Sequence, residues 1–150
     1  MSTAMNRVEL IKPQDGTPLN VLGAPVLLKS MGEDRMFIAD HPVPPGYAVP
    51  PHVHDDEDEL FYILEGELLL VSDDGEATAE PGSFVHLPRG VKHGFANVTD
   101  KPTRMLAFTT PSGNLGRLFM DLDRLAREEP GQPSPQRVAT VCAANRIRFA

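Results

Sequence analysis

Three histidines and one glutamate stand at spacings that bring metal-binding side chains together on β-strands. His52 and His54 flank Val53, and because side chains alternate along a strand, both imidazoles point to the same face. Glu59 opens the next apolar stretch, and His93 follows a turn rich in proline and glycine. Neutral imidazoles and a carboxylate from adjacent strands can hold one divalent metal and leave positions open for water or substrate. The four residues therefore predict a metal centre.

The donor set narrows the choice of metal. Three imidazole nitrogens and one carboxylate favour Fe, Mn, Ni, Co, Cu or Zn in the divalent state over the all-oxygen sites of Mg and Ca. Cys142 is the single cysteine, which excludes an internal disulfide and a cysteine-rich zinc site. The sequence has no GxSxG, P-loop, GxGxxG or HExxH motif, so serine hydrolases and nucleotide-cofactor enzymes have no support. We expect one divalent transition metal per chain.

Short strands are the elements that must position these residues. Glycine and proline make up 12 and 15 of the 150 residues, an excess that indicates many tight turns. Glu65-Gly66, Asp73-Asp74-Gly75 and Pro81-Gly82 separate neighbouring apolar runs and suit such turns. We expect strands at residues 35–43, 52–54, 59–64, 67–72, 76–80, 83–87, 93–98 and 104–109. Regular short strands of this kind predict an all-β sandwich or barrel.

The last forty residues change from a strand period to a helical one. Ser112 is expected to cap a first helix, and Pro130-Gly131 to end it. Ser134 and Pro135 suit the N-cap and first position of a second helix, and residues 147–149 return as a short strand. The inward positions of the first helix are apolar and recur at helical spacing, namely Leu115, Leu118, Phe119, Leu122 and Leu125.

We divide the chain into three parts. Residues 1–34 form an N-terminal segment whose short strands pack on the barrel or on a partner subunit. Residues 35–110 form the β-barrel, and residues 111–150 form a C-terminal helical tail of the same domain. A chain of 150 residues is typical of a single domain. Edge strands of such a barrel need cover, so we expect a homodimer.

The candidate ligands fall within two spaced patterns that suggest a family. The first pattern runs from Gly46 through the histidine pair and Glu59 to Gly66, and the second runs from Gly82 through Pro88, Gly90 and His93 to Asn97. Both resemble the two signature motifs of the cupin superfamily. Residues 59–67 and 81–85 also resemble small single-domain cupins related to the quercetin dioxygenases. The resemblance implies an antiparallel cupin β-barrel of the jelly-roll type with C-terminal helices, and a metal held inside it by His52, His54, Glu59 and His93.

Several other polar residues are interpreted as structural. Residues 55–58 are acidic, and we expect them to form a solvated loop. His41 and His86 lie outside both motifs and are expected to make structural hydrogen bonds. Cys142 lies on an inward helical face, where a buried, inert thiol is expected.

The alternation of side chains along a strand, here called strand parity, predicts some of the residues that line a substrate cavity. Phe61 and Ile63 share the face of Glu59, and Phe95 shares the face of His93. An apolar and partly aromatic pocket beside a metal suits a small organic molecule. We therefore expect these three side chains to line the cavity, although the same parity is compatible with a plain barrel core.

Three functions remain open, because cupins include dioxygenases, isomerases, polyketide cyclases and proteins without known catalysis. The first is a non-haem metal dioxygenase that acts on a small enolic or phenolic substrate, with Glu59 accepting the substrate's proton. The second is a zinc-dependent isomerase or polyketide-cyclase-like enzyme, in which the metal polarises a carbonyl. The third is a binding module that captures a small molecule without turnover.

Charge and hydropathy limit the partners. The net charge of −7 argues against a nucleic acid, which is bound largely through clustered Lys and Arg. The longest apolar run covers residues 60–64, far short of the roughly 20 residues that span a bilayer. Residues 1–10 lack the apolar core of a secretion signal. We expect a cytoplasmic protein that binds a small molecule and neither nucleic acid nor membrane.

Overall fold

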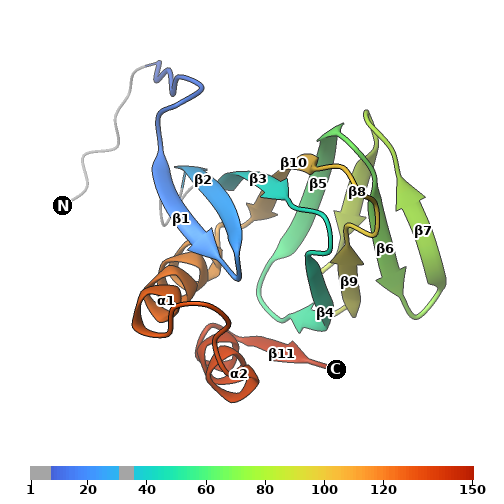
Figure 1. The fold of residues 1–150 in the computed structure, drawn as a ribbon. Coiled ribbons are helices and arrows are strands. Elements are labelled where there is room, and N and C mark those ends of the chain that lie inside the picture. Colours follow the sequence, from blue (N-terminus) through green and yellow to red (C-terminus); the bar gives the residue numbers. More distant parts are fainter. Residues whose placement is uncertain (1–7, 31–35) are drawn as a thin grey trace.

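The computed structural model describes residues 8–30 and 36–150, which form two facing antiparallel β-sheets followed by two helices (Figure 1). The strands are β1 (Thr17–Val21), β2 (Ala24–Ser30), β3 (Phe37–Val43), β4 (Ala48–His54), β5 (Asp58–Glu65), β6 (Leu68–Ser72), β7 (Gly75–Ala79), β8 (Phe84–Leu87), β9 (His93–Ala96), β10 (Thr103–Thr110) and β11 (Ile147–Phe149). The helices are α1 (Leu115–Glu128) and α2 (Pro135–Ala144). The predicted all-β class with C-terminal helices is confirmed.

The order of strands shows how the two sheets share the motif-bearing residues. One sheet has the order β1-β2-β3-β10-β5-β8, and the other has the order β11-β4-β9-β6-β7. Strand β4 lies between β11 and β9 in the second sheet, whereas β5 lies between β10 and β8 in the first. Residues at the end of β4 and the start of β5 are therefore close in sequence but belong to opposite sheets.

Alternation of apolar side chains fills the space between the sheets. On β3, Phe37, Ala39, His41 and Val43 are buried, and the residues between them are partly exposed. On β10, Met105 and Ala107 point to the same interior. Because side chains on a strand alternate between two faces, this period of two places one face of each strand in a common core.

The N-terminal segment contributes a hairpin to the first sheet. Strands β1 and β2 pair with each other, and β2 pairs with β3, so the six-stranded sheet extends beyond the expected start of the barrel at residue 35. Helix α1 packs against β1, and the ring of Phe119 meets that of Phe37 edge-on at 5.1 Å between centroids. The stretch at residues 8–11 forms no strand, and Val8 and Leu10 are exposed.

The helical tail follows the predicted pattern with one correction at its start. Helix α1 begins after Asn114 and not after Ser112, because Gly113 takes a left-handed φ of +56° that a helix cannot continue through. For α2, the side chain of Ser134 accepts a hydrogen bond from the backbone of Arg137 at 3.4 Å, and Pro135 is the first residue, as predicted. Strand β11 then pairs antiparallel with β4.

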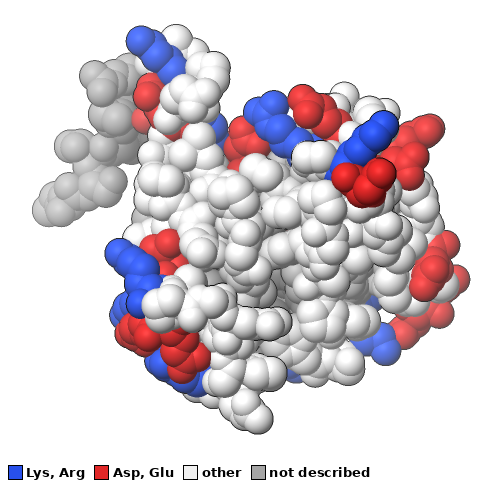
Figure 2. All heavy atoms as spheres, in the orientation of Figure 1, with Lys and Arg blue, Asp and Glu red and all other residues white. Residues whose placement is uncertain are grey.

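The surface in view carries its charges at the edges. Figure 2 shows acidic and basic side chains in small mixed groups around the margin of this face, with an uncharged area over β2, β3 and β4. In the part of the chain that the structure describes, neither helix is long and apolar enough to cross a membrane.

The two glycines that bound the first motif should differ in their tolerance of alanine. Gly66 and Gly46 both have positive φ, +74° and +81°, so each substitution imposes backbone strain of about 1–2 kcal/mol. A Cβ at Gly66 would lie 2.6 Å from the carbonyl oxygen of Pro102, whereas a Cβ at Gly46 meets nothing within 4 Å. We expect Gly66→Ala to lower the free energy of unfolding by about 1–3 kcal/mol more than Gly46→Ala, measured by urea denaturation. Equal losses in the two variants would contradict this packing.

Candidate metal centre

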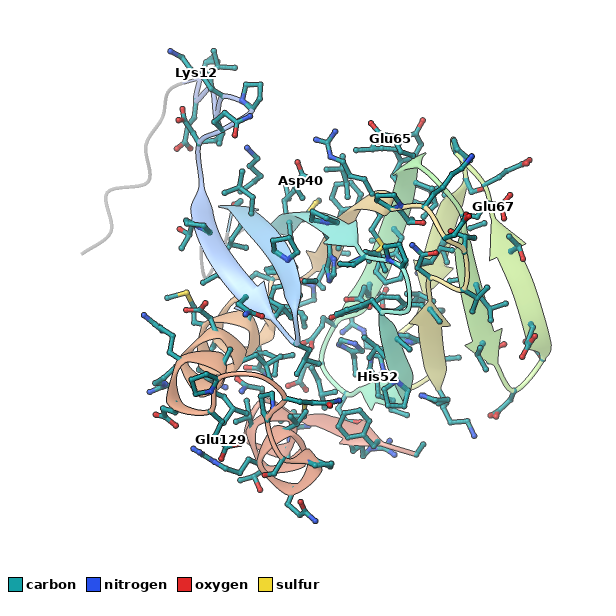
Figure 3. All side chains as sticks on the ribbon, viewed as in Figure 1. Lys12, Asp40, His52, Glu65, Glu67 and Glu129 are labelled. Atoms are coloured by element: carbon teal, nitrogen blue, oxygen red, sulfur yellow. The ribbon has the colours of Figure 1, made fainter. Side chains whose placement is uncertain are left out.

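Four buried side chains from three strands meet at one end of the barrel. His52 and His54 lie on β4, His93 lies on β9 directly opposite His52, and Glu59 comes from β5 in the facing sheet. One candidate ligand atom of each residue lies within 4.8 Å of those of the other three. Figure 3 shows His52 at the end of the barrel nearest to the helical tail. Glu65 and Glu67 lie at the opposite end of the barrel. The structure thus brings together all four predicted residues.

The spacing of these atoms suits ligands of one ion. The Nε2 atoms of His52 and His54 are 3.1 Å apart, and Oε1 of Glu59 lies 3.4 Å from Nε2 of His93 and 3.7 Å from Nε2 of His54. Two ligands that each bind an ion at about 2.1 Å, at right angles, are themselves about 3.0 Å apart. Nε2 of His93 is buried and has no hydrogen-bond partner among the described residues. Since an unsatisfied buried polar atom is costly, the site fits a metal that accepts its lone pair.

Hydrogen bonds on the other side of each ring set the tautomer. Nδ1 of His52 donates to the carbonyl of Pro50 at 2.8 Å, and Nδ1 of His93 donates to the carbonyl of Val91 at 3.2 Å. Nδ1 of His54 donates to Oε1 of Glu57 at 3.2 Å. Because carbonyl and carboxylate oxygens only accept, the proton of each neutral ring resides on Nδ1. All three Nε2 atoms then present lone pairs to the same point, as metal ligation requires.

The shifted pKa values of Glu59 and His52 favour the protonation states that bind a metal ion. Burial raises the pKa of Glu59, but the nearby His54, His93 and His52 outweigh it and lower the pKa to about 2, so this carboxyl is ionised at neutral pH. Burial and the neighbouring His93 lower the pKa of His52 to about 4, against the opposing influence of the Pro50 carbonyl. A carboxylate and a neutral imidazole are the forms that bind a metal.

The acidic stretch at residues 55–58 is not the solvated loop that we expected. Glu57 is fully buried beneath the start of α1. The other three carboxylates pair with arginines far away in the sequence: Asp55 with Arg148 at 3.2 Å, Asp56 with Arg146 at 2.7 Å, and Asp58 with Arg89 at 3.0 Å. The prediction was wrong for Glu57, which is fully buried, whereas the three aspartates stay partly exposed. Their arginine partners come from the end of the chain and from the turn before β9, and a local charge pattern does not indicate such partners.

A cavity beside the candidate metal centre has His52, His54 and Glu59 in its wall. Phe61 and Phe95 line it, as strand parity suggested. Ile63 is not part of the lining that the structure describes: it shares the face of Glu59 but lies farther along β5, where it is fully buried in the barrel core. The tail contributes much of the remaining lining through Leu115, Leu118, Phe119, Leu122, Cys142, Ile147 and Phe149. Burial raises the pKa of Cys142 to about 11, which keeps the thiol protonated.

His41 is a cavity residue that the sequence analysis had interpreted as structural. It is 3% exposed on the inward face of β3, and its Nδ1 donates to the carbonyl of Pro42 at 2.8 Å. Burial lowers its pKa, so the ring is neutral and Nε2 is an acceptor, to which no described protein group donates. The neighbouring Tyr47 already donates its hydroxyl to the carbonyl of Val21 at 3.0 Å. The alternation of side chains along β3 could have indicated that His41 points inward, because it lies on the same face of the strand as Phe37 and Ala39.

Comparisons with known proteins agree with this architecture. An uncharacterized protein of Methanocaldococcus jannaschii is 26% identical over 114 residues, which cover 74% of this chain and 89% of the relative. Quercetin 2,3-dioxygenase of Bacillus subtilis is 31% identical over 79 residues, which cover 53% of this chain but only 23% of that enzyme. A solved sugar phosphate isomerase of the cupin superfamily from Silicibacter pomeroyi has a TM-score of 0.54 and 30% identity, covering 58% of this chain and 59% of the isomerase.

A family model described as Cupin domain matches residues 41–109. The matched segment contains all four convergent residues and the strands that carry them. Residues 41–109 therefore resemble a cupin domain, and the similarities support the cupin superfamily.

Proposed function

We propose that this chain is a non-haem metal dioxygenase that acts on a small enolic or phenolic substrate. The observation that carries the proposal is the convergence of His52, His54, Glu59 and His93 beside an apolar cavity, whose wall includes the first three. The similarity to part of a quercetin 2,3-dioxygenase supports it. Members of the family commonly bind a divalent metal, and the donor set here suits Fe, Mn, Ni, Co, Cu or Zn.

The charge of the cavity selects for a substrate with one acidic oxygen. A divalent metal with neutral imidazoles and the Glu59 carboxylate leaves a net charge of +1, which favours an enolate or a phenolate. No Lys or Arg is among the described residues that line the cavity. A phosphate or a dicarboxylate would therefore enter a largely apolar space without a second cation to pair with. An apolar, aromatic body carrying a single ionisable hydroxyl matches this lining better.

The residues around the metal have separate tasks in such a reaction. The metal, when bound, supplies a Lewis-acidic centre for the ionised oxygen of the substrate and, as a redox-active ion such as Fe(II), the chemistry that engages dioxygen. Glu59 accepts the proton of the substrate hydroxyl. Its low pKa makes it a weak base, so it suits acidic enols and phenols more than aliphatic alcohols. The aromatic lining, including Phe61 and Phe95, excludes water from the ionised substrate.

An isomerase or polyketide-cyclase-like enzyme is the second candidate, favoured by the similarity to a sugar phosphate isomerase. In that reaction the same four residues would hold zinc, and the substrate would be rearranged without consumption of oxygen. The absence of Lys and Arg from the described cavity lining argues against a phosphorylated substrate for this chain. A binding module without turnover is the remaining alternative.

We also propose a cytoplasmic homodimer. Among the described residues, β1 is the last strand of the six-stranded sheet, and α1 covers part of its outer edge, where the backbone N–H of Asn20 donates to Asp123. A second copy would pair with the remainder of this edge. Light scattering at tens of micromolar distinguishes the dimer from a monomer.

Metal binding should stabilise the fold. Ligands from three strands join one ion, and a thousandfold excess over Kd adds about 4 kcal/mol, which corresponds to a rise in Tm of roughly 10 °C for a domain of this size. His93→Ala should abolish most of the rise, whereas His86→Ala should retain it, because His86 is an exposed residue outside the site. Differential scanning calorimetry with and without a chelator measures both. Identical melting temperatures in metal and in chelator would exclude the site.

The metal-dependent rise in Tm should depend on pH. Burial lowers the pKa of His54, but Glu59 and Glu57 outweigh it and raise the pKa above its usual 6.5. A proton therefore competes with the metal at this ligand already near neutral pH, and the metal-dependent rise in Tm should shrink as the pH falls from 8 through the raised pKa. A rise that is constant between pH 8 and pH 5 would contradict this assignment.

Oxygen consumption tests the proposed reaction. Protein loaded with Fe(II) should consume oxygen with at least one member of a panel of flavonols, 1,3-diketones and catechols, followed with an oxygen electrode. The His52→Ala, His54→Ala double variant should show only background uptake. Zinc as the native metal, together with turnover that consumes no oxygen, would favour the isomerase. Tight binding of a ligand without any turnover would favour the binding module.

His41 should bind a second polar group of the substrate. For a substrate that carries a further hydroxyl, His41→Leu should raise KM about 5–10-fold through loss of one hydrogen bond, with little change in kcat. The analogue that lacks this hydroxyl serves as the control and should give the same KM with both proteins. A KM unchanged by the substitution for every hydroxylated substrate would show that His41 does not contact the substrate.

A further inference from the structure

Glu57 is a fully buried carboxylate that is not one of the four candidate ligands. It lies in the short connection between β4 and β5, three residues after His54 and two before Glu59. A buried carboxyl group requires partners in place of water. Its neighbours Asp55, Asp56 and Asp58 pair with arginines, whereas the structure gives Glu57 no Lys or Arg partner among the described residues.

The two oxygens of Glu57 accept from two different elements. Oε1 lies 3.2 Å from Nδ1 of His54 on β4, and Oε2 lies 3.5 Å from the backbone nitrogen of Asn114, the N-cap of α1. Gly113 packs directly against the carboxylate, and a Cβ at that position would overlap Oε2. Glu57 is therefore enclosed between a candidate metal ligand and the start of the helix that covers the cavity.

His54 differs in this respect from the other two histidines. Nδ1 of His52 and of His93 each donate to a backbone carbonyl two residues earlier in the chain, at Pro50 and Val91. Those contacts come from the local backbone and do not depend on another side chain. His54 alone among the three uses a side-chain acceptor, and a carboxylate raises the basicity of a ligating imidazole more than a carbonyl does.

We propose that Glu57 is a positioning residue of the metal centre, which holds His54 as the Nδ1–H tautomer with Nε2 toward the metal and links this ligand to the start of α1. The inference rests on the proposed metal binding and adds a residue outside the ligand set. Because α1 contributes Leu115, Leu118 and Phe119 to the cavity lining, the same carboxylate joins the metal centre to the cover of the cavity.

The test compares two substitutions with opposite expectations. Glu57→Gln replaces the carboxylate with an amide, which is uncharged and has only one acceptor oxygen. The amide can therefore accept from Nδ1 of His54 or from the backbone N–H of Asn114, but not from both. In the control Asp56→Asn, the pair with Arg146 is weakened and the contact with the Asn114 side chain is altered, but the His54 contact is untouched. The probe is Co(II), whose affinity is measured by competition with a chromophoric chelator and whose visible spectrum reports ligand geometry.

We expect Glu57→Gln to weaken Co(II) binding about 10–100-fold and to change the visible spectrum, and Asp56→Asn to keep both within twofold of the unaltered protein. Glu57→Asp, which retains the charge but shortens the side chain by one methylene, provides a second variant if Glu57→Gln does not fold. It should also weaken Co(II) binding. Unchanged affinity and spectrum in the folded Glu57 variant would overturn the inference.

A measurement without metal separates this inference from the proposed function. Nitrogen-15 NMR of the metal-free protein should show His54 as the Nδ1–H tautomer. If the unaltered protein binds no Co(II) but His54 has this tautomer, the proposed metal function fails and the contact with Glu57 stands. If His54 is the Nε2–H tautomer, the inference is wrong whatever the metal affinity.

Discussion

The burial of three imidazoles and one carboxylate at the end of an otherwise apolar barrel is the constraint on which the rest of the structure depends. Polar groups at such a place destabilise the fold unless each finds a partner. The Nδ1 side of every ring is satisfied by protein acceptors, while Nε2 of His93 is not. Both sheets must close before the four side chains meet, because Glu59 comes from one sheet and the histidines from the other. A shared metal ion accounts for this arrangement with a single interaction.

The helical tail completes the cavity that the barrel leaves open. Helices α1 and α2 and strand β11 contribute apolar side chains to its lining, and α1 also packs on β1. Arg146 and Arg148 pair with Asp56 and Asp55 and so hold the end of the tail next to the candidate ligand His54. The connection between β4 and β5 thus positions the candidate ligands and anchors the cover over them. A change in this connection would affect both the centre and the access to it.

Much of the architecture could be predicted from local sequence patterns. The spacing of His52, His54, Glu59 and His93 identified the convergent residues, because a strand period of two and the family motifs both constrain them. Turn residues located most strands to within a few positions, and Ser134 with Pro135 marked the start of α2. These features depend on neighbours within a few residues, which the sequence displays directly.

The start of α1 was misplaced because of the local conformation of Gly113, and the other differences involve partners that lie far apart in the sequence. Glu57 is separated by 57 positions from Asn114, and no local pattern indicates that α1 begins above it. Ile63 has the parity of a cavity residue, but the depth at which the cavity ends is set by packing between the sheets and the tail. His41 makes the structural hydrogen bond that was expected of it, to the carbonyl of Pro42, but its place in the cavity lining was not predicted because it lies outside the motifs. The rings of Tyr47, just before β4, and of Phe95 on β9 lie next to it.

The most direct test of the account is anomalous X-ray diffraction from crystals of the metal-loaded protein, recorded on both sides of the absorption edge of the metal. The account predicts one strong anomalous peak per chain, about 2.1 Å from Nε2 of His52, His54 and His93 and from a carboxylate oxygen of Glu59. A peak elsewhere, or no peak in crystals whose protein contains stoichiometric metal by elemental analysis, would contradict it.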